Sequence, residues 1–459
     1  MQSDTTASQE LQTDTEIPEV ETAPTATVAR WTGGVTARKW APLLARFTIV
    51  QAVVQVVGLT AGLLIVRALP KREYAFYTIA NTMLATILEL ADSGISGALA
   101  AIGGRIWQNG RQLGSVLNTA LQLRRQLAAI TIFVVVPVLA WLLRENGASL
   151  LVIAALIAAV LVGSGLELVT RIYSVALRLR SEIRQIQKQA FMAALAKLAV
   201  VAAALFIFFN ATVAIVAVVV GYAVQFEMLR RWVQREVDRS APRDPAMRSE
   251  IVSVLKRQAP HSIYYCLQGQ IMVWLISIFG NSDSVANVGA LGRLALVFAL
   301  LSSVTVEVVL PAFSRIQSLH QLRRRYFQIV VGYLGFAVLL VAVVALFPGQ
   351  VLSVLGHQYS NLHAEGILMA ACGVTTTTAG LLWATNAARA WVVPPALLIP
   401  CTLVLQAVLV VVLKLSTVRG VLLFGLWTCV PSILFSIGLA VTKMWGRGAA
   451  AIHPTCPAS

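Results

Sequence analysis

Residues 73–105 read EYAFYTIANTMLATILELADSGISGALAAIGGR, which is a polar start, a long apolar run and a basic end. Residues 284–315 read SVANVGALGRLALVFALLSSVTVEVVLPAFSR and follow the same plan in the second half of the chain. An apolar run of about 18 or more residues can cross roughly 30 Å of hydrocarbon as a helix. Both stretches are therefore predicted to span a membrane.

Working outward from these two stretches, we find twelve such runs along the chain. They are Phe47–Val66, Tyr77–Ala101, Leu127–Leu143, Ala148–Leu168, Ala190–Phe209, Thr212–Leu229, Ser262–Phe279, Val285–Ala312, Phe327–Phe347, Ala364–Ala384, Trp391–Leu413 and Gly420–Lys443. Most are long enough to cross the membrane once. The sequence therefore predicts an all-α polytopic membrane protein.

The lysines and arginines between these runs fall mostly on alternate sides. Of the 36 in the chain, the loops of one side hold only Arg67, Lys71, Arg72, Arg144, Lys414 and Arg419, and the spans hold Lys197 and Arg293. Because basic loops stay in the cytoplasm, we expect a multi-pass protein of the bacterial inner membrane with both termini cytoplasmic. The net charge of +16 then reflects topology and contact with anionic lipid, and not nucleic-acid binding.

The runs divide into two sets of six around a basic loop. Because six is even, both sets start on the same side, which predicts about 12 transmembrane helices in two parallel, pseudo-symmetric six-helix lobes around a central cavity. The expected parts are a disordered acidic tail with a basic juxtamembrane end (1–44), an N-lobe (45–230), a basic cytoplasmic linker (231–258), a C-lobe (259–443) and a cytoplasmic C-terminal tail (444–459).

The composition leaves little room for covalent chemistry. Hydrophobic residues make up 58% of the chain and charged residues 12%. The longest predicted periplasmic loop, 348–362, contains His357 and lies beside His363, without the third ligand that a metal site needs. A GxxxxGK[ST] phosphate loop is also missing from the sequence. We expect no catalytic residue, no metal and no cofactor, and we expect any uphill movement to depend on an ion gradient, the membrane potential or downstream consumption.

Four short segments carry a resemblance to a known family. Val66–Tyr77 (VRALPKREYAFY) and Leu90–Gly97 (LADSGISG) lie in the first half, and Leu310–Arg315 (LPAFSR) and Leu352–Tyr359 (LSVLGHQY) in the second. In order and spacing they resemble the bacterial polysaccharide flippases of the multidrug/oligosaccharidyl-lipid/polysaccharide exporter superfamily.

The resemblance implies a pair of six-helix lobes that moves an undecaprenyl-diphosphate-linked oligosaccharide to the periplasmic leaflet by alternating access. It also implies work beside a polysaccharide polymerase and glycosyltransferases, for exopolysaccharide or lipopolysaccharide export. The alternative that stays open is a 12-span secondary transporter of drugs or small solutes, which would look similar by topology alone. An integral-membrane glycan polymerase is disfavoured, because it would be expected to carry a sizeable periplasmic loop.

Charges inside spans are costly and are functional candidates by default. Glu89 and Asp92 are spaced i,i+3 on one helix face. Two carboxylates that close repel, so one of them could bind H⁺ or Na⁺ in one state of a transport cycle. The alternative is a structural role for Asp92, with local hydrogen bonding at a helix break near Ser93 and Gly94.

Cations inside spans suit an anionic lipid diphosphate. Arg293 and Lys197 are candidates for the substrate pathway, although either could also snorkel to the membrane surface. Glu307 is placed on nearly the same face as Arg293, about 21 Å further along the helix by rise alone.

Uncharged amides form a second set of pathway candidates, consisting of Gln51, Gln55, Gln268 and Gln270. Amides can hydrogen-bond sugar hydroxyls, and they can equally link neighbouring helices.

Overall fold

The computed structural model describes residues 37–106, 108–180, 182–238, 240–242, 244–304, 313, 318–389, 391 and 393–445. Within this part the chain is helical and has no strand. Residues 1–49 and 50–459 form two separate units, and the arrangement below concerns the second. Most of the expected N-terminal tail and all of the expected C-terminal tail after Trp445 lie outside the described residues.

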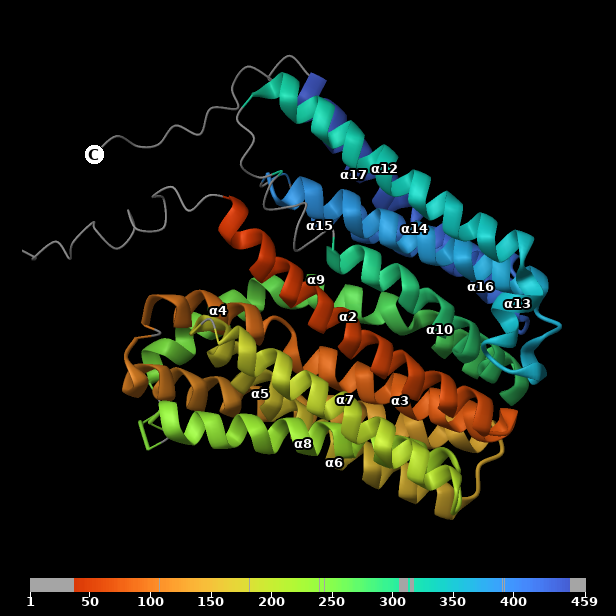
Figure 1. Ribbon diagram of the computed structural model, residues 1–459, viewed down its shortest axis with the longest axis horizontal. Helices are drawn as coiled ribbons and strands as arrows, with labels where there is room; N and C mark the ends of the chain where they lie inside the picture. Colours follow the sequence, from red (N-terminus) through yellow and green to blue (C-terminus); the bar gives the residue numbers. More distant parts are fainter. Residues whose placement is uncertain are drawn as a thin grey trace, which may run out of the picture. The chain divides into compact units, whose positions relative to one another are not determined.

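Each of the twelve predicted spans corresponds to a helix or to a pair of helices (Figure 1). In the first half these are α2 (Ala37–Ala68), α3 (Lys71–Asp92), α4 (Ile95–Ile106), α5 (Gly110–Glu145), α6 (Leu150–Leu179), α7 (Ile183–Leu205) and α8 (Ala211–Glu236). In the second half they are α9 (Pro245–Phe279), α10 (Ser282–Val304), α12 (Leu319–Leu346), α14 (His363–Ala387), α15 (Pro395–Val412), α16 (Val418–Thr428) and α17 (Val430–Trp445). The short α13 (Pro348–Ser353) and the 3-10 helix η2 (His357–Tyr359) join α12 to α14.

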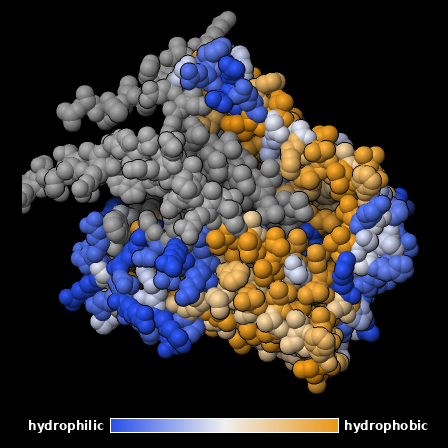
Figure 2. All heavy atoms as spheres, viewed as in Figure 1, coloured by the Kyte–Doolittle hydropathy of each residue, from blue (hydrophilic) through white to orange (hydrophobic). Residues whose placement is uncertain are grey.

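Among the described residues, nine helices are long and apolar enough to cross a membrane, or ten if α3 and α4 form one bent span. On the face shown in Figure 2, hydrophobic residues form a broad band with hydrophilic residues beyond it at the helix ends. A band of this kind matches the hydrocarbon core of a bilayer. The chain is a multi-pass membrane protein.

The predicted span Tyr77–Ala101 is broken near Ser93 and Gly94, as one of the two alternatives for Asp92 had it. α3 ends at Asp92, and α3 and α4 meet at 46°. Ser93 and Gly94 at the break both have positive φ values, 37° and 97°, which cannot continue a right-handed helix. Asp92 Oδ1 accepts hydrogen bonds from Ser96 N (3.3 Å) and Ser96 Oγ (2.7 Å), and so caps the first turn of α4.

The helices form two groups by their contacts. One group packs α3 to α8 together, and the other packs α10 and α12 to α17 together. α9 touches both, since it contacts α3, α4 and α5 on one side and α10 and α16 on the other, and α3 also packs on α10. α8 and α9 extend into the expected linker, ending at Glu236 and beginning at Pro245.

The apolar core is shared at one end of the helices and divided at the other. We call the end with the basic-poor loops the outer end and the opposite one the inner end. A single buried cluster joins both groups through the outer part of the molecule, from Tyr74 and Ile215 to Val285 and Tyr359. At the inner end, one cluster combines α4, α5, α6, α8 and the start of α9, and a separate one combines Phe313 with α12, α17 and Trp391.

Candidate functional site

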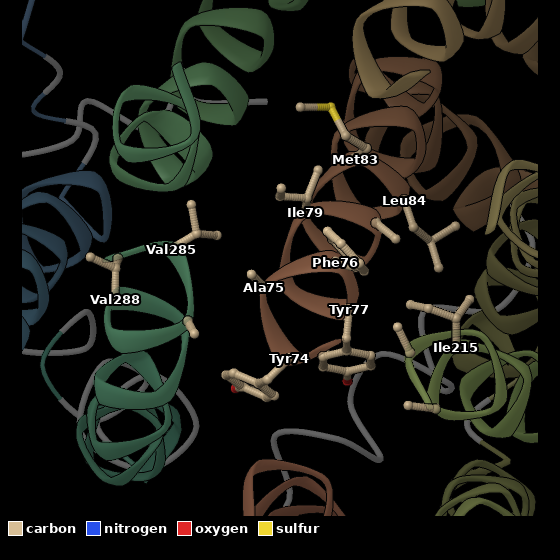
Figure 3. Packing of buried hydrophobic residues seen from close by; sticks show 14 of the residues in the cluster. Tyr74, Ala75, Phe76, Tyr77, Ile79, Met83, Leu84, Ile215, Val285 and Val288 are labelled. Atoms are coloured by element: carbon tan, nitrogen blue, oxygen red, sulfur yellow. The ribbon is translucent and has the colours of Figure 1, made fainter. Parts of the chain in front are cut away.

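Arg293 lies on α10 against the first two turns of α3. Its Nε donates to Tyr74 Oη (3.4 Å) and its Nη2 to Tyr77 Oη (3.2 Å), and the guanidinium lies 5.8 Å from the centre of the Tyr77 ring. The two tyrosines are three residues apart and therefore share a face of α3, and their rings stack at 5.8 Å. Figure 3 shows both at the same end of α3, which lies between α10 and α8.

The groups that accept hydrogen bonds from Arg293 are neutral. Phenol hydroxyls accept its hydrogen bonds, and no carboxylate forms an ion pair with it in the described part of the chain. On the opposite side lies the backbone of α2, where a Cβ placed on Gly62 would be 3.4 Å from Nη1. The guanidinium is only partly buried. Its positive charge is thus fixed in place and remains uncompensated.

The other in-span cation, Lys197 on α7, packs on α8. Its Cβ lies 3.7 Å from the position that a Cβ on Gly221 of α8 would occupy. From there its charge acts on the Tyr77 hydroxyl, as does that of Arg293. The structure therefore brings Tyr77 within electrostatic range of both predicted in-span cations. We call Arg293, Lys197, Tyr74 and Tyr77 the cation site.

Glu89 and Asp92, which face the same way on α3, each pair with an arginine. Asp92 Oδ1 pairs with Arg124 of α5, and Glu89 Oε1 pairs with Arg171 Nη1 of α6 at 2.8 Å. Arg171 Nε also contacts Glu167 Oε1 at 3.3 Å. The five charges come from three helices, and we call them the ionic network.

Arg124 precedes the predicted span Leu127–Leu143, which leaves it in a loop, and this prediction is wrong. It lies inside α5 with 1% of its side chain exposed, donating to Leu168 O (3.0 Å) and Ser96 Oγ (2.9 Å) as well as to Asp92. Only the apolar window from Leu127 was recognised in the sequence. α5 in fact begins at Gly110, where the Asn109 side chain accepts from the backbone N–H groups of Arg111 and Gln112. An asparagine cap before a run of helix formers is the signal that could have shown it.

The predicted amides are scattered. Gln268 on α9 and Gln406 on α15 exchange two hydrogen bonds, at 3.2 and 2.7 Å, and so link two helices. Gln55 is exposed and Gln270 is partly buried. The side chain of Gln51 and the whole of Glu307 lie outside the described residues.

Two of the motif segments meet at the outer end. Arg67 donates to Val354 O (2.8 Å) and Ser353 O (2.9 Å), and Gln358 Nε2 donates to Val66 O (3.0 Å) and Leu69 O (3.2 Å). Gly356, with φ of 115°, turns the chain beside Arg67. These bonds join α2 to the segment between α13 and η2, although the two are far apart in sequence.

Tyr359 completes this contact. Its ring packs edge-on against Tyr74 at 6.4 Å, and Lys71 Nζ lies 5.8 Å from its centre. Burial, followed by the neighbouring Tyr74 and Asp283, raises the pKa of Tyr359, so the ring stays a neutral phenol. We call Arg67, Lys71, Gln358 and Tyr359, with the carbonyls they bind, the outer seam. It lies beside the cation site, since Tyr74 belongs to both contacts.

Glu73, which precedes Tyr74 in the motif segment Val66–Tyr77, has a structural role. Its Oε2 accepts a hydrogen bond of 2.8 Å from Ala211 N at the start of α8. A carboxylate at a helix N-terminus is favoured by the unpaired N–H groups and the helix dipole. Glu73 therefore fixes the outer end of α8 against α3, while the next residue, Tyr74, faces Arg293.

The fold has known relatives among solved structures. The chain resembles a multidrug resistance MATE family transporter of the MOP superfamily in its inward-facing conformation (TM-score 0.59, 16% identity, covering 88% of this chain and 98% of that one). It resembles an outward-facing conformation of such a transporter about as well (TM-score 0.58, 17% identity, 88% and 94% covered). The chain has the fold of the MOP-superfamily transporters.

A third structure with this fold is described as a MOP superfamily transporter from Pyrococcus furiosus whose reversed binding-pocket polarity suggests a different function (TM-score 0.53, 14% identity, 86% and 96% covered). Neither a protein-family model nor a curated protein sequence matches the chain. At these identities the likeness concerns the fold, and the substrate has to be argued from this chain's own residues.

Proposed function

We propose that this protein is a flippase for an undecaprenyl-diphosphate-linked oligosaccharide in the bacterial inner membrane, for exopolysaccharide or lipopolysaccharide export. The observation that carries the proposal is the contrast between the cation site and the ionic network. Arg293 donates to two neutral tyrosine hydroxyls, and the charge of Lys197 acts on one of them, whereas Glu89 and Asp92 are each paired with an arginine. Within the described part of the chain, the charge of Arg293 has no carboxylate partner, and a positive charge without such a partner suits an anionic substrate.

The cation site lies within the helix bundle, below its outer end. Arg293 is the twelfth residue of α10, and its guanidinium reaches the first two turns of α3, at Tyr74 and Tyr77. A diphosphate that crosses the membrane needs fixed donors along its path, because little water is available there to solvate it. A guanidinium supplies several N–H donors in a planar fork that fits phosphate oxygens.

The conformation supports alternating access with this site at its centre. The outer seam closes the outer end above the cation site, and the inner cores of the two groups are separate. With basic loops in the cytoplasm, this is a state closed to the periplasm. The substrate would enter from the cytoplasmic side, reach Arg293 and leave after the outer seam opens.

A drug or small-solute transporter remains the second candidate, because solved multidrug exporters share the fold. An exporter of cationic drugs would gain nothing from an uncompensated arginine beside its pathway, since like charges repel. Among drug and small-solute transporters, one that carries small anions would therefore fit the cation site.

Binding to the purified protein separates these candidates. We expect an undecaprenyl-diphosphate oligosaccharide to bind the wild type, and Arg293→Ala to weaken binding by about tenfold or more, as the loss of a charge-assisted contact predicts. Arg293→Lys should lose less, because it keeps the charge. Arg419→Ala is the matched control, since Arg419 is 63% exposed and pairs with Glu365. Equal binding of the same glycan on an uncharged lipid, or tighter binding of a cationic dye, would contradict the proposal.

A further inference from the structure

The ionic network does not balance its charges. It contains three carboxylates, Glu89, Asp92 and Glu167, but only two guanidiniums, Arg124 and Arg171. Arg124 is fully engaged by Asp92, Ser96 and a backbone carbonyl. Arg171 is divided between Glu89 and Glu167. One negative charge is therefore left over in the described part of this network.

The excess charge belongs to Glu167. Its side chain is 13% exposed, against 49% for Glu89, so water solvates Glu89 far better. Glu167 Oε1 contacts Arg171 Nε, while Oε2 is buried and has no hydrogen-bond donor. Arg124 Nε is likewise buried without an acceptor, in a side chain that is 1% exposed. The network therefore contains an unpaired donor as well as an unpaired acceptor. A buried carboxylate oxygen without a donor strongly disfavours the anion.

The groups that face Glu167 from the neighbouring helices do not supply the missing charge. The titratable groups within electrostatic range of the network are Glu89 and Asp92 on α3, Arg124 on α5, Arg171 on α6, and the neutral Tyr222 on α8 and Cys266 on α9. Tyr222 packs beside Gly163, one turn from Glu167 on α6. Apart from the two arginines already engaged, none of these is a cation.

We propose that Glu167 is a proton-binding site of this protein, taking up one H⁺ on α6 within the first helix group. Binding breaks no covalent bond: the proton joins a carboxylate oxygen, the excess charge disappears, and Arg171 is left to Glu89 alone. This site differs from the sequence-based candidates Glu89 and Asp92, which the structure places against arginines.

The proton would act on the boundary between the helix groups. Glu89 lies one turn after Thr86 on α3, and Cys266 of α9 contacts Thr86 O. α9 also packs on the second group. A change in the pairing of Arg171 with Glu89 would therefore act close to the contact between α3 and α9. The coupling of this step to transport rests on the proposed function, whereas the binding of the proton does not.

Infrared difference spectroscopy of the purified protein in lipid, recorded against pH near neutrality, tests the site without any substrate. We expect a band of a protonated carboxyl group that is lost as the pH rises and is absent in Glu167→Gln. Asp92→Asn should weaken the band at a given pH, because it removes the excess negative charge and frees Arg124, whose charge also acts on Glu167. Glu89→Gln should weaken it at a given pH, because Arg171 then pairs with Glu167 alone.

The same melting temperature in detergent for wild type and Glu167→Gln would show that this variant folds, and Glu167→Asp, which keeps a carboxyl group, should retain a band. An unchanged band in a folded Glu167→Gln, or no protonated carboxyl group in the wild type near neutral pH, would overturn the proposal. Failure of every glycan to move in proteoliposomes would count against the flippase and would leave the infrared result untouched.

Discussion

At the scale of single residues, the sequence identified the unusual charges but not their partners. Arg293 and Lys197 stood out because a cation inside an apolar run is costly. That both act on Tyr77 could not be read from the sequence, because α3, α7 and α10 are far apart along the chain. Arg124 was missed for the opposite reason, since it precedes the apolar window of its helix. To predict a buried arginine near the end of a span, the start of the helix has to be identified as well as its apolar window.

The hydrogen bonds that Tyr74 and Tyr77 accept from Arg293 should fix the orientation of the guanidinium more than its charge. Tyr77→Phe removes the acceptor of Arg293 Nη2 and keeps the ring beside the guanidinium. We expect binding of the lipid diphosphate to weaken by about three- to tenfold, as for one modest hydrogen bond, with an unchanged melting temperature. Titration of the purified variant measures this. Binding equal to that of the wild type would show that the hydroxyl does not position Arg293.

Gln268 should act as a helix link. Gln268→Leu breaks the reciprocal pair with Gln406 and leaves one amide without its partner. We expect a loss of about 0.6–2 kcal/mol in stability, as for hydrogen bonds between membrane helices. Reversible unfolding in a double-mutant cycle with Gln406→Leu measures the coupling. Unchanged stability together with reduced glycan binding would instead favour contact with sugar.

At the scale of helices, the length of the apolar runs predicted where spans occur. It did not predict where a span bends or where two helices approach each other closely. The bend at Ser93 and Gly94 follows from backbone conformations that the residues permit. The lengths of α5, α8 and α9 were underestimated, because their polar extensions pack on protein at the inner end and hydropathy does not detect them.

The approach of α10 to α3 depends on Gly289. A Cβ there would lie 2.5 Å from Thr78 Oγ1 and 2.7 Å from Thr78 Cγ2, so either the Thr78 side chain or the two helices must shift to admit it. We expect Gly289→Ala to destabilise this closed packing by about 1–3 kcal/mol, the usual range for overpacking. Adding Thr78→Ala should restore part of the loss, and melting temperatures in detergent would show it. A single variant as stable as the wild type would contradict the close contact.

The outer seam should hold the outer end closed. Arg67→Ala removes two hydrogen bonds to the carbonyls of Ser353 and Val354. Spin labels at the exposed Glu145 and Asn361 report the separation of the outer loops. We expect a larger fraction of long distances in Arg67→Ala, because the closed state loses about 1–3 kcal/mol.

The exposed Arg419→Ala is the control for charge removal at this end. An unchanged distance distribution in Arg67→Ala would mean that the seam does not determine the conformation.

At the scale of the whole molecule, the described residues form two sets of helices with a shared core at the outer end and separate cores at the inner end. The sequence predicted the two sets from the count of spans. It could not predict that Val66–Tyr77 and Leu352–Tyr359 contact each other, because a motif carries no information about its distant neighbours. Their meeting beside Arg293 places the outer closure next to the proposed substrate site.

Transfer of a fluorescent undecaprenyl-diphosphate oligosaccharide between the leaflets of proteoliposomes tests the central claim most directly. The wild type and Arg419→Ala should move it, and Arg293→Ala should be slower by at least about tenfold at subsaturating substrate. Equal rates for Arg293→Ala and the wild type, or no transfer by folded wild type while a cationic drug is exported, would contradict a flippase with a cationic pathway.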